Sequence, residues 1–153
     1  MSRVAVGGTF NPLHDGHKAL LTRAHQLSSD GELLIGITSN VMAGKKYHEV
    51  ENWEVRRQVV MDFMQNTFNT TPIIVRLDDQ FGPTIDEDFD CLVVSPETEP
   101  TAHLINTRRA EQGKQPICIE LVKYVLADDG QPISSTRVLQ GEIDIHGNLL
   151  QHR

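Results

Sequence analysis

The chain has 153 residues, of which 23% are charged, and its formal net charge is −7 at pH 7. One domain accommodates this length, and we expect it to span residues 1–153. The acidic balance argues against a protein that binds nucleic acid through a broad basic surface, and no apolar run approaches the ~20 residues that a membrane helix needs.

The N-terminus and the cysteines predict the compartment. The N-terminus enters an apolar strand directly, without the basic segment, apolar core and cleavage site of a secretory signal. Cys91 and Cys118 fall in apolar runs and are expected to be free, buried thiols rather than a disulfide or a metal site. We therefore expect a cytoplasmic protein with no nucleic-acid partner, no membrane partner and no obligate protein partner.

The first informative stretch, residues 7–17, joins a predicted strand to a predicted helix. Residues 4–6 are apolar, and a helical pattern with an apolar stripe covers residues 18–29. Gly7 and Gly8 lack a Cβ atom, so the backbone there can turn sharply and approach a ligand closely. The order is therefore strand, glycine turn and helix.

The helix after this turn begins near Asp15 and directs its free N–H groups and positive dipole end at the turn, which suits a phosphate. His14 and His17 lie three residues apart on one side of the first helical turn and add polar donors. The spacing is neither the Rossmann nor the Walker pattern. An ordinary strand–helix connection has the same order, but we favour a phosphate-handling site.

The next segments predict a buried strand and a ligand-side loop. Residues 33–37 form a nearly continuous apolar run, typical of a central parallel strand. Residues 38–51 have no clear period and predict a loop at the carboxyl end of that strand, where open α/β sheets bind ligands. The loop contains Lys45 and Lys46, which on their own are most simply solvated.

A second helix follows, with Asn52 as a plausible N-cap. Arg56 and Arg57 are adjacent on this helix, so they cannot face the same way. Its predicted buried face consists of Val55, Val59, Phe63 and Met64. Residues 73–77 predict a third strand, and the paired aspartates in the loop 78–83 are assigned to turn chemistry rather than to metal binding.

The C-terminal half predicts two more strands and two helices. Residues 90–95 form the fourth strand, a helix ending by Gly113 follows, and residues 117–125 form the fifth strand. A short helix covers residues 133–141, with Ser134 as its cap, and the rest of the chain is expected to fray.

This alternation predicts an α/β fold with right-handed crossovers. We expect a Rossmann-like, doubly wound, parallel five-stranded sheet with strand order 3-2-1-4-5 and a C-terminal Ile-Ser-Ser-Thr-Arg helix. The first strand is then central, and the first turn lies at the switch point where such sheets bind ligands.

Two motifs carry a resemblance to a known superfamily. Residues 8–17, Gly-Thr-Phe-Asn-Pro-Leu-His-Asp-Gly-His, resemble the GxFxPxHxGH signature of the HxGH nucleotidyltransferases, and residues 133–137 resemble their ISSTxR signature. The runs 92–98, 106–109 and 128–132 look like those of archaeal-type phosphopantetheine adenylyltransferases. This second resemblance spans nearly the whole chain.

The resemblance implies transfer of AMP from ATP to 4′-phosphopantetheine by direct in-line displacement, giving dephospho-coenzyme A and pyrophosphate. Mg²⁺ is expected to accompany ATP. The acceptor phosphate is already a nucleophile at neutral pH, so such a site works by positioning and by neutralising charge rather than by a strong general base. The expected partners are therefore these two small molecules.

The resemblance also implies residue roles. His14 and His17 would donate to the α-phosphate, and a loop lysine would reach the ATP phosphates. The implied catalytic residues are His14, His17, Lys45, Lys46 and Arg137. The implied ATP-binding residues are Gly7, Gly8, Gly16, His17, Ser134, Ser135, Thr136 and Arg137. The implied acceptor-binding residues are Thr9, Phe10, Lys45, Ser95 and Arg109.

One departure narrows the type and leaves the acceptor contacts open. The bacterial enzymes carry an arginine-rich segment after the fourth strand, where residues 95–100 read Ser-Pro-Glu-Thr-Glu-Pro, and the archaeal and eukaryotic type shares this absence. Arg108 or Arg109 are possible substitutes. Two alternatives stay open: another acceptor, such as nicotinamide mononucleotide or a cytidylyl acceptor, and a nucleotide-binding regulatory domain without turnover. The histidine pair and Arg137 argue against the second.

Overall fold

The fold is built on one parallel sheet whose strand order is β3-β2-β1-β4-β5. The computed structural model describes residues 2–44 and 50–150. The strands are β1 (Arg3–Gly8), β2 (Glu32–Thr38), β3 (Ile73–Leu77), β4 (Cys91–Val94) and β5 (Cys118–Leu121). All four neighbouring pairs are parallel. The predicted α/β class and strand order are confirmed.

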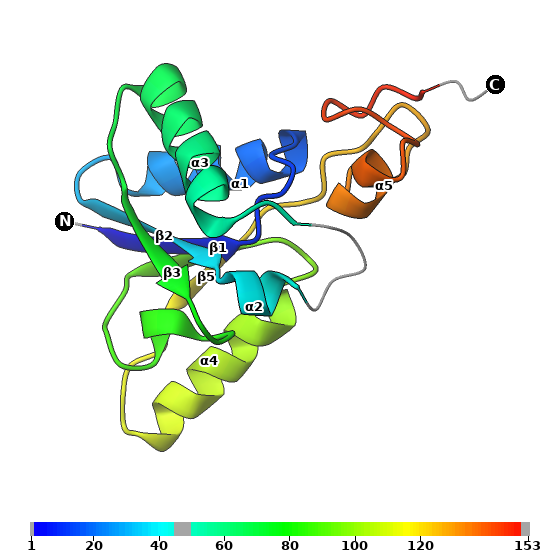
Figure 1. Cartoon of the computed structure of the whole chain (residues 1–153). Helices are drawn as coiled ribbons and strands as arrows, with labels where there is room; N and C mark the ends of the chain where they lie inside the picture. Colours follow the sequence, from blue (N-terminus) through cyan, green and yellow to red (C-terminus); the bar gives the residue numbers. More distant parts are fainter. Residues whose placement is uncertain (1, 45–49, 151–153) are drawn as a thin grey trace.

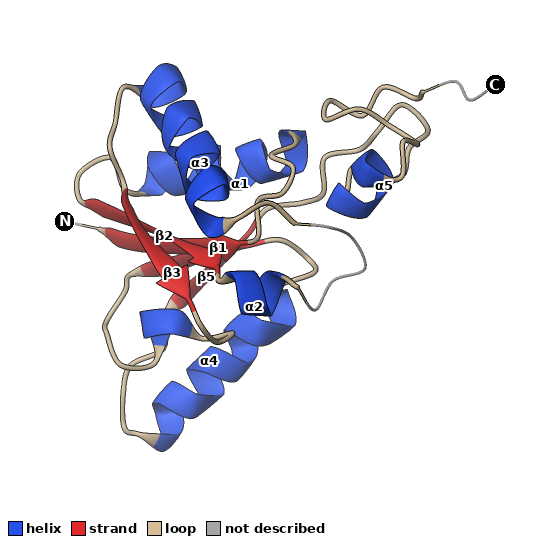
Figure 2. Ribbon diagram, in the orientation of Figure 1, coloured by secondary structure: helices blue, strands red, loops and turns tan. Residues whose placement is uncertain are grey.

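Helices cover both faces of the sheet (Figures 1 and 2). The helices are α1 (Asp15–Leu27), α2 (Asn40–Ala43), α3 (Trp53–Phe68), the 3₁₀ helix η1 (Gly82–Thr84), α4 (Glu99–Glu111) and α5 (Ser135–Leu139). α1 and α3 lie on one face and α4 on the other. Across the residues that the structure describes, no helix is both long and apolar enough to cross a membrane.

The two-residue period of β1 distributes its side chains between two cores. Val4 and Val6 belong to the core under α1 and α3, whereas Ala5 belongs to the core under α4. β1 therefore has apolar layers on both faces, as expected for the central strand of a parallel sheet. Its carboxyl end opens into the turn that leads to α1.

Two segments predicted as loops contain short helices. α2 lies within residues 38–51 and is capped by Ser39, whose hydroxyl oxygen accepts the Met42 N–H at 3.2 Å. η1 follows the Asp78–Asp79 turn, where a carboxylate oxygen of Asp79 accepts the N–H of Gly82 at 2.8 Å. This use of Asp79 agrees with turn chemistry.

The fifth strand differs from its prediction in two respects. β5 ends at Leu121 rather than at residue 125, and Cys118 is exposed rather than buried.

The predicted buried face of α3 is only partly correct: Met64 is buried and Phe63 packs against the core, but the two valines are exposed. Val55 and Val59 are 46% and 41% exposed, whereas Arg56 is 1% exposed. The buried residues of this helix are Arg56, Val60, Met61 and Met64. The stripe is rotated by about one residue because Arg56 finds hydrogen-bond acceptors inside the molecule, described below.

The C-terminal segment is packed rather than frayed through residue 150. Ile143 is fully buried and forms a small core with Ala127 and Ile133. The carbonyl oxygen of Ile145 accepts the backbone N–H of Asp15 at 2.9 Å, and the Asp15 carboxylate pairs with His146 at 3.0 Å. These contacts attach the end of the chain to the start of α1, beside the carboxyl edge of the sheet (Figure 1).

Candidate active site

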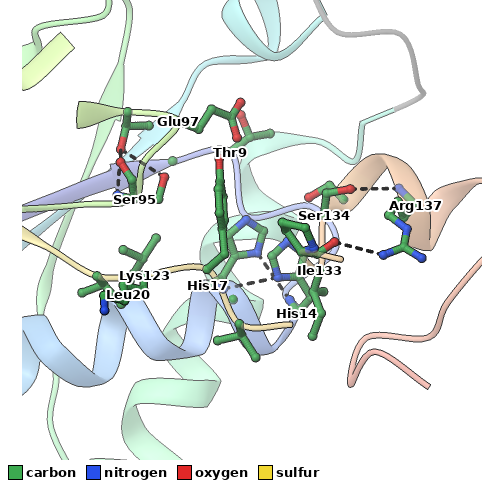
Figure 3. Close-up of a pocket in the computed structure, with 18 of the residues that line it drawn as sticks. Thr9, His14, His17, Leu20, Ser95, Glu97, Lys123, Ile133, Ser134 and Arg137 are labelled. Carbon is green, nitrogen blue, oxygen red and sulfur yellow. Dashed lines mark hydrogen bonds between the residues drawn. The ribbon is translucent and has the colours of Figure 1, made fainter. Parts of the chain in front are cut away.

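A cavity of about 590 Å³ opens at the carboxyl edge of the sheet. Its wall comes from the β1–α1 turn, the exit of β4, the segment after β5 and the start of α5. Segments more than a hundred residues apart in sequence therefore face one another across it (Figure 3). The edge is where a doubly wound sheet is expected to bind ligands.

The two histidines close the start of α1 in a reciprocal cap. The N–H of His17 donates to Nδ1 of His14, and the N–H of His14 donates to Nδ1 of His17, each at 3.3 Å. Their rings stack with centroids 3.7 Å apart. Because Nδ1 accepts a hydrogen bond in both rings, each neutral imidazole carries its proton on Nε2. The cap therefore fixes two Nε2–H donors at a helix N-terminus that lines the cavity.

His14 is neutral at physiological pH. Its side chain is buried, with 5% of the residue exposed, and burial lowers its pKa from 6.5 to about 4, although Asp15 opposes the shift. The close approach of the ring requires glycine at position 16, because a Cβ there would lie 2.8 Å from the His14 ring. The His14 ring is therefore neutral, and a contact between it and an anion would be a hydrogen bond rather than an ion pair.

The side chain of Phe10 packs against His17 and the backbone turn at Gly8. Phe10 adopts a positive φ of 53°, is 1% exposed and meets the His17 ring edge to face, with centroids 5.1 Å apart. A Cβ at Gly8 would come within 3.1 Å of the Phe10 ring. Phe10 thus holds the turn and His17 in place and does not line the cavity.

The opposite wall is the start of α5. The hydroxyl of Ser134 accepts the N–H of Arg137 at 3.2 Å, as the predicted cap requires. Arg137 lines the cavity, and its guanidinium pairs with Asp129 and, at 2.9 Å, with Glu142. These pairs raise the pKa of Arg137 and lower that of Asp129. The arginine is therefore held in position by two carboxylates, neither of which was predicted as a site residue.

The structure brings most of the predicted site residues together. Those that line the cavity are Gly7, Gly8, Thr9, His14, Gly16, His17, Ser95, Ser134, Ser135 and Arg137. Thr136 is exposed and lies outside the lining. Lys45 and Lys46 lie outside the described residues.

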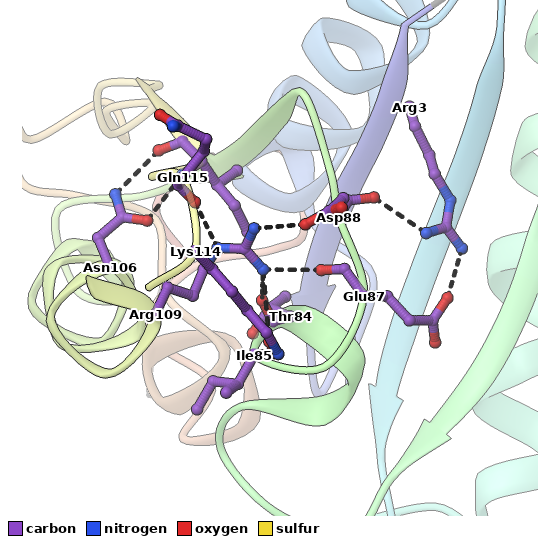
Figure 4. A network of polar contacts seen from close by, with 10 residues as sticks. Arg3, Thr84, Ile85, Glu87, Asp88, Asn106, Arg109, Lys114 and Gln115 are labelled. Carbon is purple, nitrogen blue, oxygen red and sulfur yellow. Dashed lines mark hydrogen bonds and ion pairs between the residues drawn. The ribbon is translucent and has the colours of Figure 1, made fainter. Parts of the chain in front are cut away.

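Arg109 is not at the cavity, which corrects its assignment to acceptor binding. It is 1% exposed and sits in the polar network of Figure 4. Its guanidinium donates to the carbonyl oxygens of Thr84 at 2.9 Å and Gln115 at 2.8 Å, and it pairs with Asp88 at 2.7 Å. Arg109 therefore fixes the segment between η1 and β4.

Sequence reasoning missed several cavity residues for a definable reason. Because the fifth strand was expected to continue to residue 125, Lys123 and Tyr124 were assigned to its interior, yet the strand ends earlier and both line the cavity. Asp129 lies in the run 128–132 that carries the resemblance but was given no role, and Glu142 lies in no motif. Within residues 2–44 and 50–150, no group of three or more His, Cys, Asp or Glu side chains could hold a metal ion.

A second cavity of about 200 Å³ adjoins the first. Both cavities are lined by Gly7, Gly8 and Thr98, so they meet at the carboxyl end of β1. The second lies over α4 and has mainly apolar walls. These include Leu34, Leu77, Phe81, Leu92, Ala102 and Ile105. The first cavity, lined by His14, His17 and Arg137 among others, is the more polar of the two, and the cavities share one junction.

Comparison with known proteins identifies relatives of this chain by sequence and by structure. Residues 5–141 match the family model described as cytidylyltransferase-like. The phosphopantetheine adenylyltransferase of Methanosarcina mazei is 48% identical over 97% of this chain and 97% of that protein, and that of Archaeoglobus fulgidus is 43% identical over 97% of this chain and 99% of that protein. A crystal structure of an Archaeoglobus fulgidus protein of unknown function has a TM-score of 0.76 and 40% identity, covering 80% of this chain and 99% of that one.

Proposed function

Since the chain belongs to the cytidylyltransferase-like family and, within it, to the archaeal-type phosphopantetheine adenylyltransferases, we propose that it transfers the adenylyl group of ATP to 4′-phosphopantetheine. The products are dephospho-coenzyme A and pyrophosphate, a step of coenzyme A biosynthesis. The observation that carries the proposal is the histidine cap, because it fixes the rings of His14 and His17 against a cavity with a second helix N-terminus across it.

An oxygen of the acceptor phosphate attacks the α-phosphorus, and the bond from that phosphorus to the bridging β-oxygen breaks. Negative charge grows on the α-phosphate oxygens and on the departing pyrophosphate. The Nε2–H groups of His14 and His17 would donate to the α-phosphate, and the amides and hydroxyls of Ser134 and Ser135 would hold the β- and γ-phosphates, with Arg137 alongside. No proton needs to leave the nucleophile, so no general base is required.

Mg²⁺ would enter with ATP. Since the described residues build no metal cluster, it would be held by phosphates and water, which suits its reluctance to lose water. It supplies charge neutralisation on the phosphates when bound. The side chains of this chain would then act on the phosphate oxygens through hydrogen bonds.

The second cavity would take the pantetheine arm. Its apolar walls suit the methyl and methylene groups of the arm, and its junction with the first cavity lies beside Thr9. The phosphate end of the acceptor would then lie at the junction, within reach of the α-phosphate. Ser95, at the β4 exit, would border it.

The test is release of pyrophosphate from Mg-ATP with a panel of acceptors. We expect 4′-phosphopantetheine to support release and nicotinamide mononucleotide and a cytidylyl acceptor with CTP to support far less. Faster release with nicotinamide mononucleotide would replace the acceptor while keeping the chemistry. ATP binding without release for any acceptor would support the regulatory alternative. The cytoplasmic location, the single domain over residues 1–153 and the absence of macromolecular partners stay predictions.

A further inference from the structure

Arg56 is a buried cation that the mechanism above does not use. It lies in the first turn of α3, and only 1% of the residue is exposed. Its guanidinium donates to the carbonyl oxygens of Glu51 at 2.8 Å and Thr9 at 3.2 Å. It also donates to Oγ1 of Thr38 and Oδ1 of Asn40, at 3.2 and 3.1 Å. One side chain therefore ties α3 to three segments of the chain: the turn at Thr9, residues 38–40 and Glu51.

All four acceptors are neutral oxygens. No carboxylate in the described part of the chain forms an ion pair with Arg56, although exposed Glu54 acts on it from a distance. Burial lowers its pKa, but an arginine remains protonated at neutral pH. A buried charge that finds only neutral acceptors among the described residues is costly to fold and is seldom placed where packing alone would suffice.

The hydrogen bonds of Arg56 run toward the junction of the two cavities. Thr38 receives the Arg56 hydrogen bond and donates its own hydroxyl proton to Oγ1 of Thr9, 3.0 Å away. Thr9 lines the first cavity and Thr38 the second. Because Oγ1 of Thr9 accepts from Thr38, its own proton is available to donate elsewhere. The chain Arg56–Thr38–Thr9 thus ends in a directed donor.

We infer that Arg56 is a positioning residue for the phosphate of the acceptor. Through Thr38 it directs the Thr9 hydroxyl at the junction, and its buried positive charge favours an anion there. The inference rests on the proposed function, because it identifies the anion at the junction as the acceptor phosphate rather than part of ATP. Arg56 itself touches no substrate.

Two isosteric changes test separately the hydrogen-bond chain Arg56–Thr38–Thr9, here called the relay, and the charge of Arg56. Asn40→Asp keeps an oxygen beside Arg56 and beside the Trp53 N–H, which donates to it at 2.8 Å, but places a negative charge in direct contact with the guanidinium. Thr38→Val removes the relay and leaves the charge intact. We expect each change to weaken binding of 4′-phosphopantetheine about tenfold, a typical effect of one charge-assisted hydrogen bond. The Kd for ATP should change less than about threefold, measured by calorimetry.

Arg56→Lys and Arg57→Lys provide the matched pair. The neighbour Arg57 is half-buried on the same helix and lies outside both cavities. Arg56→Lys should raise the KM for the acceptor and leave the Kd for ATP unchanged. Adding Asn40→Asp to Arg56→Lys should raise the KM for the acceptor further. Arg57→Lys should match the wild type. Thermal denaturation accompanies each measurement.

Wild-type affinity for the acceptor in both Asn40→Asp and Thr38→Val overturns the inference. Equal losses for ATP and acceptor, with a lower Tm, also overturn it, because they indicate a purely structural arginine. The wild-type protein is assayed first with 4′-phosphopantetheine. If it releases no pyrophosphate, the proposed function fails. If it does and the variants behave as the wild type, the inference alone fails.

Discussion

The histidine pair at the start of α1 has two roles, because the ring nitrogens that cap the helix also determine where each ring carries its proton. A donor aimed at charge that develops during transfer should affect kcat more than ATP affinity. By analogy with lost oxyanion donors, His17→Ala should lower kcat roughly 10²–10³-fold, about 3–4 kcal/mol.

Calorimetry with ATP in the absence of the acceptor gives the comparison for His17→Ala. The Kd for ATP should rise by much less than kcat falls. A variant that loses ATP affinity while its kcat survives would identify His17 as a ground-state ligand. The assignment of His17 to the transition state would then be wrong.

The depressed pKa of His14 predicts a pH-dependent stability. The folded protein binds this proton only near pH 4, whereas an unfolded histidine binds it near 6.5. Between these values the unfolded state holds more protons, so the free energy of unfolding falls as pH falls from about 6.5 toward 4. The loss should approach about 3 kcal/mol.

The matched control for that titration is His14→Asn, since asparagine can still cap the helix but does not titrate. Urea denaturation of both proteins between pH 7 and 4 measures the difference. Asp129 and Asp144, whose pKa values are also lowered, titrate in both proteins. Their contributions therefore cancel in the difference between the two stability curves. Parallel pH curves for the two proteins would contradict the neutral His14.

At the scale of single residues, the sequence predicts the motif residues of the site but not the roles of the buried arginines. The motif residues of the turn and of α5 were found because short spacings carry them, and the cavity contains them. Arg109 and Arg56 were missed or misassigned because a sequence does not show which carbonyl oxygens will face an arginine. Each finds neutral backbone acceptors inside the fold, and only tertiary structure supplies these.

At the scale of elements, the C-terminal segment was predicted to fray because it has no helical or strand period. Its main apolar anchor is Ile143, buried against Ala127 and Ile133. Ile143→Ala should lower the free energy of unfolding by about 2–4 kcal/mol, the usual cost of such a cavity. Leu149→Ala, at a position 51% exposed, should cost less than about 0.5 kcal/mol. If the two substitutions lower the free energy of unfolding equally in urea denaturation, the segment frays as the sequence predicts.

The helix α4 offers a test of the acceptor arm. Thr101 lines the second cavity, whereas Thr107 is exposed on the same helix. Thr101→Leu should narrow the cavity and raise the KM for 4′-phosphopantetheine about tenfold, with the KM for ATP unchanged. Thr107→Leu makes the same substitution outside the cavity and should leave both values at the wild-type level. An unchanged KM for the acceptor in Thr101→Leu would remove the arm from this cavity.

For the whole molecule, the sheet order was predictable because alternating strands and helices with right-handed crossovers leave few arrangements. Strand ends were less predictable: β5 stops at Leu121 because the chain then leaves the sheet to reach α5. That early exit creates part of the cavity wall. The site therefore depends on a boundary, the feature that local sequence defines least.

The proposed site joins segments from both ends of the chain. ATP would contact the β1–α1 turn through its α-phosphate and the start of α5 through its β- and γ-phosphates, whereas AMP lacks the second set. Hydrogen exchange of residues 7–17 should slow with either nucleotide, and that of residues 134–138 should slow with ATP alone. The edge strand β3 (Ile73–Leu77), whose residues other than Leu77 line neither cavity, serves as the internal control. Equal protection of α5 by AMP and ATP would show that the triphosphate does not reach the second helix N-terminus.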